Sequence, residues 1–111
     1  MSSVVIKSHD PAAIARAVAD YVACLRAGHP EIRRVIWFGS RTTGIPLPGS
    51  DVDLCLVLSS SDKPARSRMV DYLPVGFPVG IDLFAYTEAE FAALPEQAPG
   101  WHAAIMSGRE I

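Results

Sequence analysis

Two short apolar runs, residues 35–38 and 54–58, flank a segment that can form neither a helix nor a long strand. The intervening segment contains Pro46, Pro48 and Gly49, and each proline removes an N–H that regular structure requires. Apolar runs this short are typical of buried strands rather than of helices. The pattern therefore predicts strands at residues 35–38 and 51–58, joined by a loop.

Polar residues of the types that bind phosphate or metal ions lie at both ends of this loop. Gly39 and Ser40 follow the first run, and Asp51 and Asp53 open the second. A Gly-Ser turn can present backbone N–H groups and a hydroxyl to a phosphate. Because side chains alternate along a strand, we expect the two carboxylates on one face, about 6.5–7 Å apart, and Val52 in the core. Such a pair suits Mg²⁺ and can hold two ions for nucleotidyl transfer.

Three further residues complete this candidate site. Asp82 interrupts the apolar run of a third predicted strand, residues 79–86, where an unpaired charge would be costly to bury. If that strand lies beside the second, Asp82 becomes a third metal ligand and can accept the proton of an attacking hydroxyl. Arg41 is placed to bind phosphates, and Ser50 can donate a hydrogen bond to a carboxylate or a phosphate.

Each signal has an ordinary explanation when it is taken alone. Gly-Ser after a strand is common turn chemistry, and Asp-x-Asp also occurs in turns, Ca²⁺ loops and sugar-nucleotide enzymes. A lone aspartate in a strand, such as Asp82, is often a structural carboxylate. The three signals occurring together, each at a strand edge or inside an apolar strand, favour a site for metal and nucleotide.

The rest of the chain predicts helices around these strands. Asp10 and Pro11 begin a helix that Gly28 closes, and Asp62 caps a short helix over residues 64–73. Thr87 begins a capping box with Glu90, and that helix extends to about residue 94. A last helix covers residues 101–107. The predicted architecture is a single α+β domain over residues 1–111, a small mixed sheet flanked by helices.

Composition restricts the partners and the compartment. The net charge of −2 and the pI of about 5.8 argue against binding nucleic acid through bulk electrostatics. Cys24 and Cys55 are predicted to be buried, reduced thiols. Arg33 and Arg34 are interpreted as a solvated junction between a helix and a strand. Since no run approaches 18 apolar residues, we expect no membrane association and a cytoplasmic location.

The motif GSRTTGIPLPGSDVDL, with Asp82 beyond it, resembles that of the DNA polymerase β-like nucleotidyltransferases. More closely, the chain resembles the minimal nucleotidyltransferases, small proteins often paired as antitoxins with HEPN-domain toxins. The C-terminal segment YTEAEFAALPEQAPGWHAAIMSGREI is similar in kind to the tail of that group. The sequence departs from the group at Thr42, Thr43 and Ile45 and in the short segment 59–78, which bears on nucleotide affinity and on the choice of acceptor.

The resemblance implies an enzyme that transfers AMP from ATP, with two Mg²⁺ ions, to a hydroxyl group. Larger relatives carry a helical domain for the acceptor, so the expected acceptor is a partner protein, namely a tyrosine of a HEPN-type toxin. The alternative is an antitoxin that neutralises its partner by occlusion without catalysis. A glycosyltransferase-type Asp-x-Asp site fits the upstream Gly-Ser poorly. The sequence leaves the nucleotide preference and the oligomeric state open, a homo-oligomer included.

Overall fold

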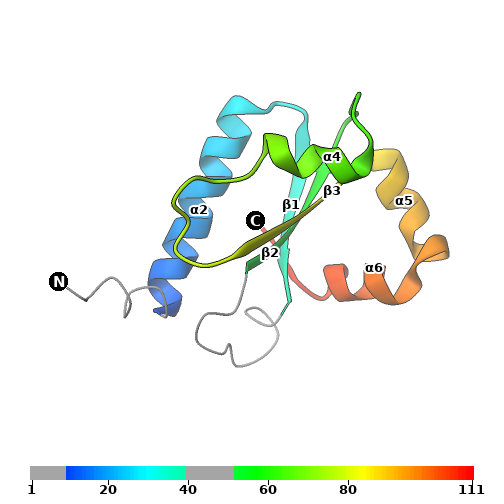
Figure 1. The fold of residues 1–111 in the computed structure, drawn as a ribbon. Coiled ribbons are helices and arrows are strands. Elements are labelled where there is room, and N and C mark those ends of the chain that lie inside the picture. The colour runs from blue at the N-terminus through cyan, green and yellow to red at the C-terminus, as the bar shows by residue number, and fades with distance from the viewer. Residues whose placement is uncertain (1–9, 40–51) are drawn as a thin grey trace.

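The computed structural model describes residues 10–39 and 52–111. These residues form a four-stranded mixed sheet with helices on both faces (Figure 1), which confirms the predicted α+β class. The elements in chain order are α2 (Pro11–Gly28), β1 (Ile32–Phe38), β2 (Val52–Leu58), α4 (Ala65–Arg68), the 3₁₀ helix η1 (Met69–Asp71), β3 (Ile81–Thr87), α5 (Glu88–Gln97), α6 (Pro99–Met106) and β4 (Arg109–Glu110).

The sheet has the strand order β3-β2-β1-β4. β1 is antiparallel to both of its neighbours, β2 and β4, whereas β2 and β3 run parallel. A parallel pair needs a crossover, and the segment with α4 and η1 supplies it. The N-terminal ends of β2 and β3 therefore meet at the edge of the sheet where β1 ends.

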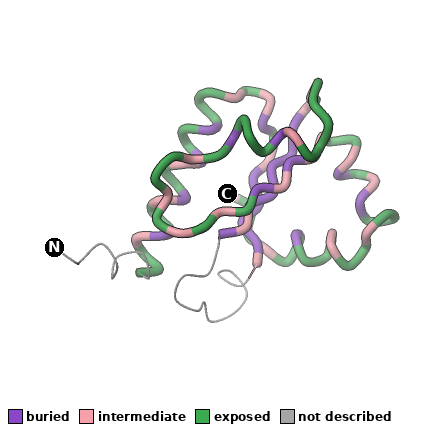
Figure 2. Tube along the Cα trace, viewed as in Figure 1, coloured by how far each residue is buried: buried purple, intermediate pink, exposed green. Residues whose placement is uncertain are grey.

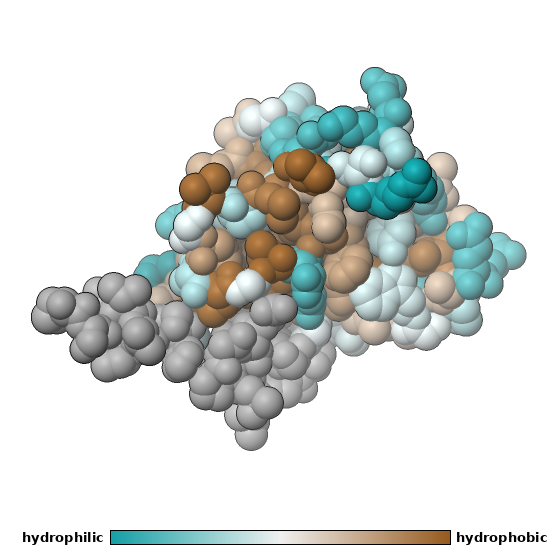
Figure 3. Space-filling model, in the orientation of Figure 1, coloured by the Kyte–Doolittle hydropathy of each residue, from teal (hydrophilic) through white to brown (hydrophobic). Residues whose placement is uncertain are grey.

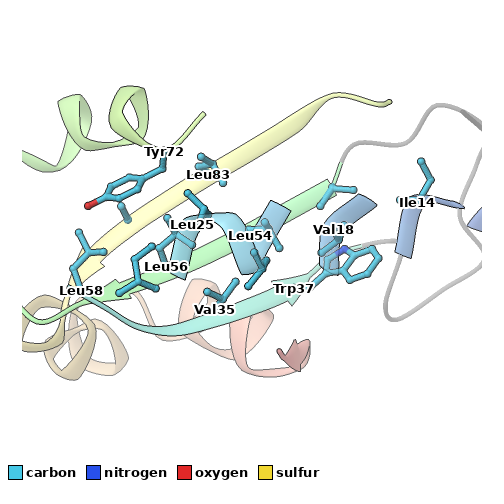
Figure 4. Packing of buried hydrophobic residues seen from close by; sticks show 14 residues of the cluster. Ile14, Val18, Leu25, Val35, Trp37, Leu54, Leu56, Leu58, Tyr72 and Leu83 are labelled. Atoms are coloured by element: carbon cyan, nitrogen blue, oxygen red, sulfur yellow. The ribbon is translucent and has the colours of Figure 1, made fainter. Parts of the chain in front are cut away.

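The core has two layers, one on each face of the sheet. On one face, α2 packs its stripe of Ile14, Val18, Val22 and Leu25 against alternate residues of the strands, and Figure 4 shows this packing. On the other face, α5 and α6 cover a second cluster around Cys55 and Val57. The central strands are buried over residues 35–38 of β1 and 54–58 of β2, among the purple segments in Figure 2. Two-sided burial explains why their sequences are nearly continuous apolar runs.

The helix ends follow local chemistry that the sequence predicts correctly. The Asp10 carboxylate accepts a hydrogen bond from the Ala12 N–H at 3.0 Å, and Pro11 occupies the first helical position of α2. At α5, the Thr87 hydroxyl accepts from the Glu90 N–H, and the Glu90 carboxylate accepts from the Thr87 N–H. This reciprocal pair is the predicted capping box.

Several boundaries differ from the prediction. The helix predicted over residues 64–73 is only α4 followed by η1, and no side chain caps α4, so the proposed Asp62 cap is wrong. β1 begins earlier than predicted, at Ile32, and β3 begins later, at Ile81. α5 continues through Pro95 to Gln97, and the short strand β4 was not predicted. β4 has only two residues, too few to show any periodicity.

The two cysteines differ in exposure, contrary to the prediction that both are buried. Both thiols are free, and Cys55 lies in the sheet, where burial raises its pKa to about 12. Cys24 is exposed because it falls outside the buried stripe of α2. In the described ranges, no helix has the length and apolarity to cross a membrane.

Candidate active site

Asp53 and Asp82 are directly paired across the parallel strands β2 and β3. Neighbouring strands lie about 4.8 Å apart, and paired residues point to the same face, so the two carboxylates share one site. Asp53 is half-buried and Asp82 is exposed at this end of the sheet. Val52, between the predicted ligands, is fully buried as expected. The sequence placed Asp82 in the site only if the third strand lies beside the second. The structure has this arrangement.

Gly39 lies directly against Asp53. Its φ of +91° is in the left-handed region that glycine adopts without penalty. A Cβ at this position would overlap Asp53 Oδ2 and approach Asp53 Cγ to 3.2 Å. β1 pairs Phe38 with Asp53, so the backbone passes over the carboxylate as the strand ends. Gly39 is therefore required by the position of Asp53, a reason that is independent of any phosphate.

Four of the predicted site residues lie outside the described residues. They are Ser40, Arg41, Ser50 and Asp51. Their proposed roles, in phosphate binding for the first three and in metal binding for Asp51, remain predictions from the sequence. What the structure describes is the Gly39 end of the loop and the Asp53 end, which meet at the same point of the sheet.

The described part of the site supplies two of the three predicted carboxylate ligands. In residues 10–39 and 52–111, no group of three or more His, Cys, Asp or Glu side chains could hold a metal ion. The third predicted ligand, Asp51, precedes Val52 in the chain. Two adjacent carboxylates offer only oxygen donors, the type that Mg²⁺ prefers, and a site exposed at a sheet edge leaves room for its waters. Asp53 and Asp82 thus fit a partial Mg²⁺ site that further oxygen ligands must complete.

An aromatic group borders the carboxylates on the same face of the sheet. Phe84 follows Asp82 by two residues, and its ring lies 5.0 Å from that of Trp101 on α6. Phe38 completes the group, with its ring centre 5.5 Å from Trp101. Trp101 Nε1 donates a hydrogen bond to the Tyr86 hydroxyl at 2.8 Å. These rings hold α6 against the sheet and form an apolar wall beside Asp82.

Comparison with known proteins identifies the family of the chain. The family model of the nucleotidyltransferase domain matches residues 20–99. The chain belongs to the nucleotidyltransferase domain family. The matched range contains Gly39, Asp53 and Asp82, and the activity that the family supports is nucleotidyl transfer in general.

A solved structure has the same fold as this nucleotidyltransferase domain. It is a crystal structure of a protein from Sulfolobus solfataricus assigned as a nucleotidyltransferase, with a TM-score of 0.59 and 22% identity. The match covers 81% of this chain and 79% of the other. At this identity the likeness concerns the fold, which is the polymerase β-like nucleotidyltransferase fold. A search of curated proteins found no match.

One residue that organises the nucleotidyltransferase domain was missed by sequence reasoning. Arg68 has a buried side chain, only 6% exposed, whereas the basic residues near it in the sequence, Lys63 and Arg66, are exposed. Its guanidinium donates to the Lys63 and Ala85 carbonyls at 2.8 and 3.2 Å and to both Glu90 oxygens at 2.5 and 3.1 Å. Arg68 thereby ties the crossover to β3 and to the start of α5. The pairing joins residues distant in sequence, so no local pattern indicates it.

Arg33 and Arg34 lie at the start of β1, the end opposite to Gly39. Arg33 is exposed, as predicted for a solvated junction. Arg34 forms a bidentate pair with Glu110 at 2.9 and 3.1 Å, and its guanidinium lies 5.5 Å from the centre of the Phe91 ring. This pair lowers the pKa of Glu110 through its hydrogen bonds. Neither arginine belongs to the candidate site.

Proposed function

We propose that this nucleotidyltransferase transfers AMP from ATP to a hydroxyl group of a partner protein, with Mg²⁺ as the cofactor. The observation that carries the proposal is the direct pairing of Asp53 with Asp82 beneath the end of β1. Mg²⁺ bound there would neutralise charge on the phosphates as it shifts towards the leaving group. Family membership supports nucleotidyl transfer, whereas ATP, Mg²⁺ and a protein acceptor are our own proposals.

The chemistry is an in-line displacement at the α-phosphorus. The acceptor oxygen forms a bond to this phosphorus, the bond from the α-phosphorus to the bridging oxygen breaks, and pyrophosphate leaves with that electron pair. Asp82, exposed at the sheet edge, is placed to accept the hydroxyl proton. Asp53, packed beneath Gly39, is held in one position and therefore acts as the fixed carboxylate of the pair.

The proposed acceptor is a tyrosine of a HEPN-type toxin, which would make this chain the antitoxin of a toxin–antitoxin pair. The support for this partner is the resemblance of residues 39–54 and of the C-terminal segment to the minimal nucleotidyltransferases. A HEPN protein encoded beside the gene is the partner to test first. In this proposal AMP addition inactivates the toxin covalently.

Intact mass spectrometry of that partner, after incubation with ATP and Mg²⁺, tests the proposal. We expect the mass of one or more AMP groups on the partner, and sub-stoichiometric amounts of this chain should suffice because an enzyme turns over. Asp82→Asn should lower kcat/KM by about 10²- to 10³-fold, since it removes stabilisation of transition-state charge. Its thermal stability should hold or rise as repulsion from Asp53 is relieved.

Asp20→Asn is the matched control, because Asp20 is an exposed carboxylate on α2, away from the site, and the change should leave transfer unaltered. Protection of the partner by Asp53→Asn in a strict one-to-one ratio, with no mass added, would instead establish neutralisation by occlusion. A large loss of stability in Asp82→Asn would assign that residue a structural role.

A further inference from the structure

β3 is an edge strand, and no further strand of the described residues pairs with its outer side, which we call the open edge. The hydrogen bond from the Val52 N–H to the Gly80 carbonyl, 2.9 Å long, sets the phase of the parallel pairing with β2. In this phase the backbone groups of even-numbered β3 residues point to β2, and those of odd-numbered residues point outward. The Leu83 N–H and C=O and the Ala85 N–H have no hydrogen-bond partner in the described part of the chain.

The open edge ends at the Ala85 carbonyl. The Arg68 guanidinium donates to the Ala85 carbonyl and occupies the edge there, while its other N–H groups bind Glu90 and the Lys63 carbonyl. Beyond it, the Thr87 N–H is satisfied by Glu90 in the capping box. The open stretch therefore extends from the Ala85 N–H back to Ile81, and Asp82 lies within it.

A groove of about 350 Å³ follows the open stretch. Residues 83–86 of β3 form one wall, and Ala65, Arg66 and Met69 form the other. Figure 3 shows apolar side chains gathered on the side of the molecule that carries the crossover, where Met69 is 39% and Val70 67% exposed. The groove thus combines unpaired backbone groups with apolar walls, which is the combination that binds an extended polypeptide as an added strand.

Charge indicates what kind of segment fits. Arg66 is exposed on the wall of the groove and makes no ion pair with any described residue. A bound segment with an acidic side chain opposite Arg66 would therefore bind more tightly than one without it. A second copy of this chain fits less well, because antiparallel pairing of two β3 strands about Phe84 needs both Ala85 carbonyls, and Arg68 already holds them.

We propose that the open edge of β3 binds the acceptor polypeptide as an added, acidic strand and so brings its hydroxyl to Asp82. The inference rests on the proposed function for the identity of the bound segment. Arg68 closes one end of the edge, so the added strand can pair only between Ala85 and Ile81. This limit sets its register, and the register determines which residue of the acceptor faces the carboxylates.

The first test uses a pool of octapeptides, each with one fixed tyrosine and otherwise randomised, bound to the protein without nucleotide. We expect enrichment of peptides with an acidic residue at a constant distance from the tyrosine. Arg66→Glu should change this preference to a basic residue and weaken binding of the original peptides at least tenfold. Arg16→Glu, an exposed change on α2, is the control and should leave the selection unaltered. An empty selection, or one unchanged by Arg66→Glu, would overturn the proposal.

Amide hydrogen exchange gives a readout specific to strand addition. In the free protein, the Phe84 amide should exchange slowly, and the outward Leu83 and Ala85 amides should exchange quickly. The enriched peptide should slow these two outward amides at least tenfold and leave Phe84 nearly unchanged. Unaltered exchange at Leu83 and Ala85 with peptide bound would refute strand addition. Protection that grows with protein concentration and needs no peptide would assign the edge to a second copy.

Adding ATP and Mg²⁺ to the bound peptide separates this inference from the proposed function. Peptide docking with protected outward amides but no AMP transfer would contradict the proposed acceptor chemistry and, with it, the identity of the bound segment. Transfer to the tyrosine with unprotected Leu83 and Ala85 amides would contradict the docking mode alone. Transfer with protection supports both.

Discussion

Gly39 and Asp53 show how single residues build this site. The chain leaves β1 with a positive φ at Gly39, and it does so directly over the Asp53 carboxylate. The position of the Asp53 carboxylate therefore requires a residue without a side chain at position 39, because a Cβ there would take the space that this carboxylate occupies.

Replacing Gly39 should therefore damage the site more than the fold. Gly39→Ala places a Cβ in contact with Asp53 Oδ2 and adds left-handed strain of about 1–2 kcal/mol. We expect a loss of this size in the free energy of urea unfolding and at least a tenfold loss of affinity for ATP with Mg²⁺ in calorimetry. Gly28→Ala is the control, because a Cβ there meets no atom within 4 Å. Unchanged ATP affinity in Gly39→Ala would show that Gly39 does not contribute to nucleotide binding.

Between elements, Arg68 makes a polar connection that joins the crossover, β3 and α5. Its guanidinium satisfies two backbone carbonyls and one carboxylate, so its removal leaves several acceptors without donors. The same contact closes the open edge of β3. One side chain thus both stabilises the packing of α4 and limits what can pair with the sheet.

Arg68→Met should lower the free energy of unfolding by about 2 kcal/mol, because hydrogen bonds to a charged group are lost from a buried position. Urea unfolding measures this change. Arg66→Met on the same helix is the matched control and should stay within about 0.5 kcal/mol, since Arg66 is exposed. Equal effects of the two changes would show that Arg68 contributes no more than a surface residue.

The Glu90 carboxylate makes this connection dependent on pH. Hydrogen bonds from Arg68, and then from Thr87, hold the pKa of Glu90 below its ordinary value of 4.5. A folded pKa below the unfolded one contributes stability that is present above pH 4.5 and is lost as the pH falls through the lowered pKa. The Tm of wild type should therefore fall more steeply than that of Glu90→Gln below about pH 5. Parallel Tm curves in circular dichroism would contradict this linkage.

At the scale of the whole molecule, two core layers share the central strands β1 and β2. Trp37 lies in the α2 layer and Trp101 borders the α5–α6 layer, so each of the two tryptophans reports on one face of the sheet. Trp37 Nε1 is buried and has no hydrogen-bond partner among the described residues, which lowers the stability that the α2 layer contributes. Because every apolar residue of β2 belongs to one layer or the other, we expect the layers to unfold together.

Single-tryptophan variants test this cooperativity. Trp37→Phe leaves Trp101 as the fluorescent probe of one layer, and Trp101→Phe leaves Trp37 as the probe of the other. In each variant, the urea midpoint from fluorescence should coincide with the midpoint from far-ultraviolet circular dichroism. Trp37→Phe should also cost little stability, since it removes an unsatisfied donor along with apolar area. Separate midpoints would mean that the two faces of the sheet unfold independently.

Much of this protein is determined by local sequence. The start of α2 at Asp10 and the capping box of Thr87 and Glu90 were predictable because their hydrogen bonds span two or three residues. The strands of the core were predictable because two-sided burial demands continuous apolar runs. The candidate carboxylates were predicted from the same apolar runs, because Asp51 and Asp53 open the second run and Asp82 interrupts the third.

Tertiary structure decided what these elements do together. Asp82 joins Asp53 only because β3 pairs in parallel with β2 in one register, and register depends on packing over the whole sheet. Arg68 reaches Glu90 across 22 residues, a contact that no local pattern records. β4 follows from the same packing, because it pairs with β1 at the other edge of the sheet. Local sequence selects conformations through short-range hydrogen bonds and periodicity, whereas the site and its open edge arise from contacts between segments that only the folded chain brings together.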